Sequence, residues 1–262
     1  MKKYGPFLIG GSIYPLRVSI SIPAFFWPKW FKDDYKLFKS MMKNPSEFPI
    51  RANRPIFMDK KLEAGQLSGY FIQDLYMAQK IYKANPKKHV DIGSRIDGFV
   101  AHVASFREIE LLDIRDVKSS IPNVKYKQAD LMDEDSITAD YCDSVSCLHA
   151  LEHFGLGRYG DPIDPYGHIK GIKNIAKMLE GGGMFYLSVP IGSQRIEFNA
   201  HRVFGLQYLF DIVSTEFDIV SFSYIDDQSH LYTNVDIYSE QTKSSFGCCY
   251  GIALLELQKK NY

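Results

Sequence analysis

The sequence predicts an α/β fold in which helices cover both faces of a doubly wound, mostly parallel sheet. Three observations indicate this fold class. From His89 onward, short apolar stretches alternate with stretches of helical periodicity, a glycine-containing turn follows the first apolar stretch, and Asp113 and Asp130 close the next two. Ligands of such sheets bind at the carboxyl ends of the strands, so the pattern also predicts where a site should lie.

Composition limits the size of the core and the classes of partner. The chain has 262 residues, 45% of them hydrophobic, which is enough for one large core. Lys plus Arg equals Asp plus Glu at 31 each, so no net field attracts nucleic acid or an anionic membrane. No apolar stretch reaches the roughly 18 residues of a membrane span, and glycines and prolines interrupt the apolar start. We expect a cytoplasmic protein with reduced cysteines and a small-molecule partner.

Residues 1–85 are expected to form an N-terminal cap and residues 86–262 the main domain. The stretch up to about residue 60 is rich in Pro and aromatic residues without a sustained period, which indicates an irregular, aromatic-rich lid or arm. Within it, IPAFFWPKWF (22–31) either packs on the main core or contacts a membrane surface or partner. One helix is predicted from Ser68 to Lys83, because apolar residues recur at helical spacing and Asn85-Pro86 ends it.

The main domain is predicted from the alternation of strand-like and helical stretches. The predicted helices are 99–106, 168–179 and 205–213, and Gly181–Gly183 are expected to cap the second of them. The predicted strands are 89–93, 109–114, 124–130, 141–150, 184–190, 217–225 and 250–258. Since only a polar loop joins the last two strands, we expect them to pair antiparallel at one edge of the sheet.

The turn after the first strand, DIGSRIDG, indicates the class of ligand. Gly93 and Gly98 occupy the outer positions of a GxGxxG motif, but Arg95 replaces the middle glycine that admits a pyrophosphate. No nucleoside-triphosphate loop is present, so a nucleoside without phosphates remains. Asp113 follows the first strand at the spacing of about 20 residues at which a carboxylate binds ribose hydroxyls. Asp130 can accept a hydrogen bond from an adenine amino group.

On these motifs the chain resembles class I methyltransferases that use S-adenosylmethionine. The motifs are HVDIGSRIDGF, ELLDIRD, KQADL and CLHALEHF, and the match covers about residues 86–260. The resemblance implies a Rossmann-like sheet of seven strands, with an antiparallel last strand and the methyl donor over strands one to four. The residues expected to bind this cofactor are Asp91, Gly93, Ser94, Arg95, Gly98, Asp113, Ile114, Asp130, Leu131 and His149, with Tyr70 and Gln73 from the preceding helix.

A closer resemblance is to a little-characterised bacterial and nematode subgroup of these methyltransferases. It rests on LSGYFIQDLYMAQ, HVDIGSRIDGFVAH, HALEHFGLGRYGDPIDP and PIGSQRIEFNAHR. Members of this subgroup resemble enzymes of surface-polysaccharide modification.

The fourth predicted strand runs into HALEHF, which supplies candidate catalytic groups. Methyl transfer requires an aligned acceptor and removal of its proton. We expect His149 to contact the donor and Glu152 or His153 to act as general base, unless His153 is a packed histidine under the loop. The candidate metal ligands match no metal-binding spacing, so no metal is expected; they are Glu152, His153, Asp161, Asp164 and His168.

Two later loops are expected to form the acceptor side. In GLGRYGDP (155–162), Arg158 can bind a phosphate or carboxylate, Tyr159 can stack on a sugar or base, and Asp161 can form hydrogen bonds. The alternative is an ordered turn in which Arg158 pairs with Asp161. The second loop, residues 190–204, carries a second candidate base and further acceptor contacts, namely His201, Asn199 and Arg202; alternatively, Asn199 caps a helix.

The resulting expectation is an O-methyltransferase for a small molecule. The acceptor would be a sugar, or a nucleotide-linked, phosphorylated or phosphoramidate precursor of a bacterial surface glycan. The fourth strand ends in LHAL rather than in the Asn-Pro-Pro-aromatic signature of DNA amine methyltransferases, so nucleic acid is not expected as the acceptor. The alternatives are an inactive binding subunit with the donor fold and, more remotely, a nicotinamide-dependent oxidoreductase. The oligomeric state stays open.

Overall fold

The computed structural model describes residues 24–261 except 45, 47, 51–54, 62–64, 66 and 119. The chain divides into two units, Met1–Gln66 and Leu67–Tyr262. Helix α2 (Gly69–Ala84) coincides with the helix predicted from Ser68 to Lys83. It belongs to the larger unit, whereas it was expected to be part of the N-terminal cap, residues 1–85.

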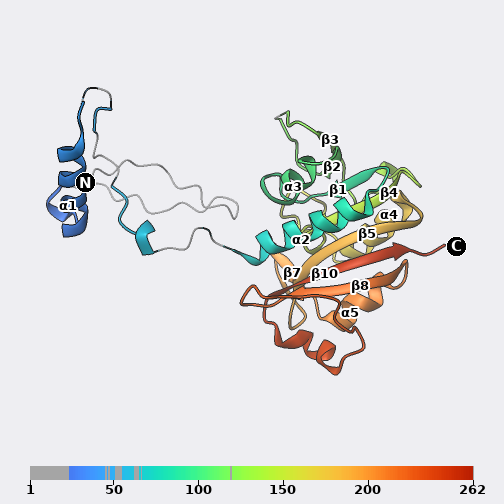
Figure 1. Ribbon diagram of the computed structural model, residues 1–262. Coiled ribbons are helices and arrows are strands. Elements are labelled where there is room, and N and C mark those ends of the chain that lie inside the picture. The colour runs from blue at the N-terminus through green and yellow to red at the C-terminus, as the bar shows by residue number, and fades with distance from the viewer. Residues whose placement is uncertain are drawn as a thin grey trace. The chain divides into compact units, whose positions relative to one another are not determined.

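One sheet runs through the larger unit (Figure 1). The first five strands pair in parallel, and β10 is antiparallel to both of its neighbours. The mostly parallel α/β fold expected from the sequence is therefore confirmed. In spatial order the strands are β3 (Val124–Gln128), β2 (Ile109–Asp113), β1 (His89–Ile92), β4 (Cys142–Leu148), β5 (Leu179–Ile191), β10 (Gly251–Lys259), β8 (Phe217–Ile225) and β9 (Leu231–Tyr232).

Two details of the sheet differ from the prediction. It has eight strands rather than seven, because the short β9 pairs antiparallel with the end of β8. The last two long strands do pair antiparallel, but β10 lies between β5 and β8 instead of at the edge. β10 is buried along nearly its whole length, whereas the first half of β8 alternates between buried and exposed residues. A strand with a continuous apolar run is suited to an interior position with both faces covered.

Helices pack on both faces of the sheet through two buried clusters. The helices on one face are α2 and α3 (Ala101–Ala104), the latter preceded by the turn η3 (Ile96–Val100). The other face packs against α4 (Gly167–Met178) and α5 (Leu206–Val213). The expected glycine cap of α4 is wrong, because Gly181–Gly183 lie inside β5, which begins directly at Leu179.

The smaller unit contains a helix where an irregular arm was expected. Helix α1 (Lys29–Met41) buries none of its residues. The rings of Trp27 and Tyr35 lie 5.7 Å apart, and that of Phe31 lies 5.0 Å from Trp27. This spacing of four residues is helical, but the surrounding prolines hide it in a sequence scan. No helix among the described residues is long and apolar enough to span a membrane.

Candidate functional site

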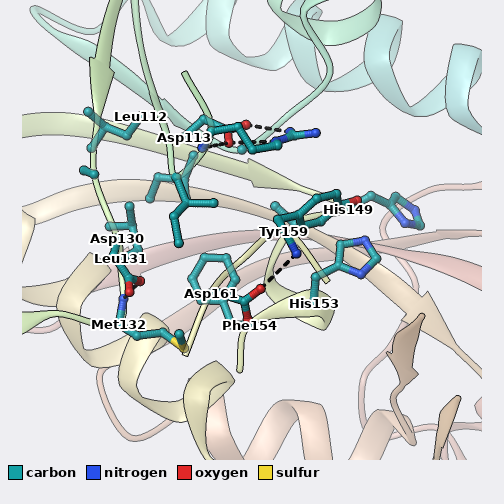
Figure 2. A pocket seen from close by; sticks show the side chains of 16 residues that line it. Leu112, Asp113, Asp130, Leu131, Met132, His149, His153, Phe154, Tyr159 and Asp161 are labelled. Carbon is teal, nitrogen blue, oxygen red and sulfur yellow. Dashed lines mark hydrogen bonds and ion pairs between the residues drawn. The ribbon is translucent and has the colours of Figure 1, made fainter. Parts of the chain in front are cut away.

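A pocket lies at the carboxyl ends of β1, β2 and β4 and beside the loop after β3 (Figure 2). Figure 2 shows Asp113 and Asp130 on one side of it and His149, His153 and Tyr159 on the other. Among the residues expected at the cofactor, those that line it are Gly93, Asp113, Ile114, Asp130, Leu131 and His149. Three of the expected catalytic and acceptor residues also line the pocket, namely His153, Tyr159 and Asp161. The remaining lining residues were not anticipated: Ile92, Leu112, Arg115, Ala129, Met132, Ala150 and Phe154.

The Asp113 carboxylate, at the end of β2, binds a neighbouring arginine. Its Oδ1 accepts hydrogen bonds from the backbone N–H and the Nε of Arg115, at 2.8 and 2.9 Å. Its Oδ2 accepts from Nη2 of Arg115 at 2.7 Å. The Asp113 side chain is 8% exposed and that of Arg115 is 52% exposed. The motif ELLDIRD contains this arginine, but the spacing of residues in the sequence does not predict that its side chain binds the aspartate two positions earlier.

Asp130 and its neighbours form the wall opposite. Oδ1 of Asp130 accepts a hydrogen bond from the backbone N–H of Met132 at 2.9 Å. The side chain of Asn174, on α4, donates to the carbonyl of Leu131 at 2.9 Å. This loop is therefore anchored to the helix below it, and the half-buried Asp130 is held at the pocket.

Asp91 and Ser94 shape the glycine turn from inside and do not line the pocket. Oδ1 of Asp91 accepts from the hydroxyls of Ser94 and Ser146 at 2.8 and 2.5 Å, and Oδ2 accepts from the backbone N–H of Ser94 at 3.0 Å. Complete burial raises the pKa of Asp91 to about 7, although these hydrogen bonds act in the opposite direction.

The other half of the turn packs against α2. Arg95 is exposed and forms an ion pair with Asp97 at 2.9 Å. Gly98 approaches α2 so closely that a Cβ added to it would lie 2.5 Å from Oδ2 of Asp74. The neighbouring Gln73 is buried and bonds to Asp74 and to the hydroxyl of Ser188. Arg95, Gly98 and Gln73, expected at the cofactor, are therefore close to the turn without lining the pocket.

His149, Glu152 and His153 form a buried cluster after β4. Nδ1 of His149 lies 3.0 Å from Oε1 of Glu152, and Nε2 of His153 lies 3.6 Å from the same oxygen. The Tyr70 hydroxyl of α2 lies 3.4 Å from Nδ1 of His149. Within the part of the chain that the structure describes, Nε2 of His149 and Oε2 of Glu152 are buried and lack a hydrogen-bond partner. Buried polar atoms usually have a hydrogen-bond partner, so these two atoms can each take a further hydrogen bond.

The charges in this cluster favour an ionised Glu152 and a neutral His153. Burial alone would raise the pKa of Glu152, but His149 and His153 lower it below its ordinary value. Burial lowers the pKa of His153, and the nearby Arg158 adds to this, while Glu152 opposes it. Nδ1 of His153 donates to the carbonyl of Ala200 at 2.6 Å, which leaves the lone pair on Nε2. His153 can thus accept a proton, and the Glu152 carboxylate can stabilise the imidazolium that results.

The GLGRYGDP loop is an ordered turn organised by Asp161. Oδ2 of Asp161 accepts from the backbone N–H groups of Gly155 and Gly157 at 2.9 and 3.0 Å, and Oδ1 accepts from that of Tyr159 at 3.1 Å. At Gly155 φ is +78°, and a Cβ there would lie 1.9 Å from the carbonyl oxygen of Asp164. Arg158 does not pair with Asp161; its Nη1 donates to the carbonyl of Ala200 at 2.8 Å.

The second loop that was expected on the acceptor side is a hairpin of β6 (Arg195–Glu197) and β7 (His201–Val203) rather than a helix start. Asn199, with φ of +65°, lies in its turn. His201 packs against the ring of Tyr250, with centroids 5.1 Å apart, and does not line the pocket.

Arg202 is buried and holds the backbone of neighbouring loops. Its guanidinium donates to the carbonyls of Glu152, Phe154 and Pro165 at 3.3, 2.6 and 3.2 Å. Arg202 therefore positions the segment that carries the Glu152 cluster, whereas it was expected to contact an acceptor anion.

No group of three metal-ligating side chains is found among the described residues. Two of the candidate ligands have other partners. Nε2 of His168 lies 2.7 Å from the hydroxyl of Tyr208, and Asp164 pairs with Lys170 at 2.6 Å.

A family model described as "Caenorhabditis protein of unknown function, DUF268" matches residues 99–249. The chain belongs to this family. The matched region of the DUF268 chain contains β2, β3, β4 and the pocket residues from Leu112 onward. No match was found among curated proteins.

Solved structures place the DUF268 chain in a fold class. One is the Burkholderia thailandensis 1,6-didemethyltoxoflavin-N1-methyltransferase with bound 1,6-didemethyltoxoflavin and S-adenosylhomocysteine, 13% identical, with a TM-score of 0.51 over 72% of this chain and 79% of that chain. Another is a Galdieria sulphuraria protein named as a sarcosine dimethylglycine methyltransferase, 11% identical, with a TM-score of 0.51 over 71% and 85%. The fold is that of class I S-adenosylmethionine-dependent methyltransferases.

A third similar structure shows why the fold alone does not decide the reaction. It is the [4+2]-cyclase SpnF, 10% identical, with a TM-score of 0.52 over 71% of this chain and 82% of that chain. Proteins of one fold carry out different reactions, so the function has to be argued from the site.

Proposed function

We propose that this DUF268 chain is an S-adenosylmethionine-dependent methyltransferase that acts on a small-molecule acceptor. One observation carries the proposal: a single pocket gathers Gly93, Asp113, Asp130 and His149 from the ends of four successive strands. A turn that closely approaches a ligand and two carboxylates at neighbouring strand ends are the groups that an adenosine requires. S-adenosylmethionine would supply an electrophilic methyl group there.

The residues present fit this cofactor. Asp113 already receives two side-chain N–H donors from Arg115, one on each carboxylate oxygen, and the vicinal hydroxyls of a ribose offer a similar pair of donors. The carboxylate of Asp130 accepts one hydrogen bond from the described residues, and it does so through Oδ1. Its Oδ2 is therefore available to an adenine amino group. The unpaired Nε2 of His149 can accept a further hydrogen bond from the ligand.

The remaining pocket residues are suited to the acceptor. His153 is the proposed general base, because its Nε2 lone pair lies beside the ionised Glu152, which acts as a positioning group. Tyr159 offers an aromatic face, and Arg158, which does not itself line the pocket, offers a cation close to that ring. These groups support a hydroxyl acceptor on a sugar, or on a nucleotide-linked, phosphorylated or phosphoramidate precursor of a surface glycan.

The test of the donor site is calorimetric titration with S-adenosylmethionine and S-adenosylhomocysteine. We expect micromolar binding by the wild type and a loss of at least about tenfold in Asp113→Ala, since a charge-assisted pair of hydrogen bonds is worth about 1.5–3 kcal/mol. Asp116→Asn is the matched control, because Asp116 is exposed on the same loop, and its affinity should equal that of the wild type.

Two outcomes would contradict the proposed donor site. One is an absence of binding to the wild type, and the other is equal binding by Asp113→Ala. NADH serves as a comparison ligand; since Arg95 replaces the glycine that admits a pyrophosphate, we expect no binding. Incubation with methyl-labelled donor and pools of glycan precursors then tests turnover, and donor binding without any labelled product would favour the inactive binding subunit.

A further inference from the structure

Arg115 connects the proposed donor side of the pocket to the proposed acceptor side. Its guanidinium forms the two-pronged ion pair with Asp113 described above, at 2.7 Å between Nη2 and Oδ2. The same guanidinium lies over the ring of Tyr159, with Cζ 4.4 Å from the ring centroid. Tyr159 belongs to the GLGRYGDP loop, so one side chain spans the end of β2 and the acceptor loop.

A second arginine contacts the same ring. Cζ of Arg158 lies 5.2 Å from the centroid of Tyr159, so both guanidinium groups are held close to one aromatic side chain at the pocket. The charge of Arg115 is balanced by Asp113. Arg158 instead donates Nη1 to the backbone carbonyl of Ala200, and no ion pair is formed between Arg158 and a described carboxylate.

A ligand that binds Asp113 through two hydroxyls, one on each carboxylate oxygen, competes with Arg115, because Oδ1 already accepts two hydrogen bonds, one of them from Nε of Arg115. The exchange keeps the nearly buried carboxylate hydrogen-bonded, so it does not leave an unpaired buried acceptor. The displaced guanidinium loses its counter-charge, however, and the ring of Tyr159 that it contacts is also contacted by Arg158. Two like charges close to one aromatic ring attract an anion.

We propose that Arg115 and Arg158, which both contact the ring of Tyr159, form an anion subsite, and that donor binding completes this subsite by releasing Arg115 from Asp113. The ligand class is a compact oxyanion, a phosphate or carboxylate group carried by the acceptor, which arginine binds in two-pronged geometry. This inference rests on the proposed function and specifies its substrate class and the order of binding. The donor binds first, and the anionic acceptor follows.

The experiment measures the coupling between a donor analogue and an anion. S-adenosylhomocysteine is titrated into the protein with and without saturating inorganic phosphate, and chloride at the same ionic strength controls for screening. We expect phosphate to tighten S-adenosylhomocysteine binding by about fivefold or more, and S-adenosylhomocysteine to tighten phosphate binding by the same factor, since such coupling is reciprocal.

Variants of the two arginines test the assignment. In Arg115→Met, S-adenosylhomocysteine should bind at least as tightly as in the wild type, because no guanidinium competes for Asp113, and the phosphate effect should disappear. Arg158→Met should also lose the phosphate effect while leaving S-adenosylhomocysteine affinity unchanged. This second variant tests the subsite even if Arg115→Met does not fold. Lys118→Met, which removes an exposed cation from the same loop as Arg115, should behave like the wild type.

Several results would overturn the subsite. They are a phosphate effect no larger than that of chloride, a weakening of S-adenosylhomocysteine binding by phosphate, coupling that survives in both arginine variants, and a large loss of S-adenosylhomocysteine affinity in Arg115→Met. Each leaves the proposed function standing, because the donor analogue still binds the wild type. If S-adenosylhomocysteine does not bind the wild type, both the proposed function and the subsite fail.

Discussion

At the residue scale, Glu152 is a carboxylate surrounded by imidazoles. It is 1% exposed, and Oε1 lies 3.0 Å from Nδ1 of His149 and 3.6 Å from Nε2 of His153. A buried carboxylate without a hydrogen-bonded or charged partner would be costly, and the two imidazoles supply the partners of Glu152. The backbone carbonyls around the cluster are in turn held by Arg202.

The ionisation of His153 gives a prediction that needs no acceptor. Burial lowers the pKa of His153 below its ordinary value of 6.5, and Glu152 counteracts this. The imidazole of the wild type should therefore gain its proton only as the pH falls below 6.5. In Glu152→Gln the opposing charge is lost, so the pKa of His153 should fall further, as measured by NMR titration of the imidazole protons.

The same titration in Glu152→Asp serves as the control, because that variant keeps the charge. An unchanged or raised pKa of His153 in Glu152→Gln would show that the carboxylate does not act on it. The acid side of the pH–rate profile for methyl transfer should move with the NMR value if His153 is the base.

At the scale of elements, the glycine turn after β1 packs closely against α2. Gly98 lies against Asp74, and the helix also provides Gln73 and Tyr70, which contact Ser188 and His149. Burial raises the pKa of Asp74 above its usual value, while Gln73 opposes this by donating a hydrogen bond. A side chain at position 98 would therefore have to displace the carboxylate of Asp74.

Gly98→Ala should destabilise the larger unit through this contact. The added Cβ would lie 2.5 Å from Oδ2 of Asp74, and overpacking of this kind costs about 1–3 kcal/mol. In Gly98→Ala/Asp74→Ala the clashing oxygen is gone, so the double variant should lose less stability than the sum of the two single variants. Chemical denaturation measures all four proteins of the cycle, and simple additivity would show that the clash is relieved elsewhere.

At the scale of the whole molecule, the buried core belongs to the larger unit. Both hydrophobic clusters of described residues consist of side chains from Met77 onward. Helix α1 of the smaller unit buries none of its residues. The two buried clusters are therefore made of residues of the larger unit.

A chain that begins at Leu67 should accordingly fold by itself. We expect its thermal unfolding midpoint to lie within a few degrees of that of the full chain, since a shift of about 2–4 °C corresponds to 1 kcal/mol at this size. S-adenosylhomocysteine affinity should be equal in the two proteins. A midpoint that falls much further, or aggregation of the shorter chain, would show that the smaller unit contributes to stability.

The sequence by itself determined the fold class and four of the residues that line the pocket. Strand and helix periodicities are local, and acids at strand ends meet at one edge of any parallel sheet, so Asp113 and Asp130 could be predicted together with Gly93 and His149. Only the tertiary structure decided that β10 lies between β5 and β8, that the guanidinium of Arg115 pairs with the Asp113 carboxylate, and that Arg202 donates to backbone carbonyls. These depend on contacts between segments distant in the chain and on the direction of long, flexible side chains, which residue spacing does not specify.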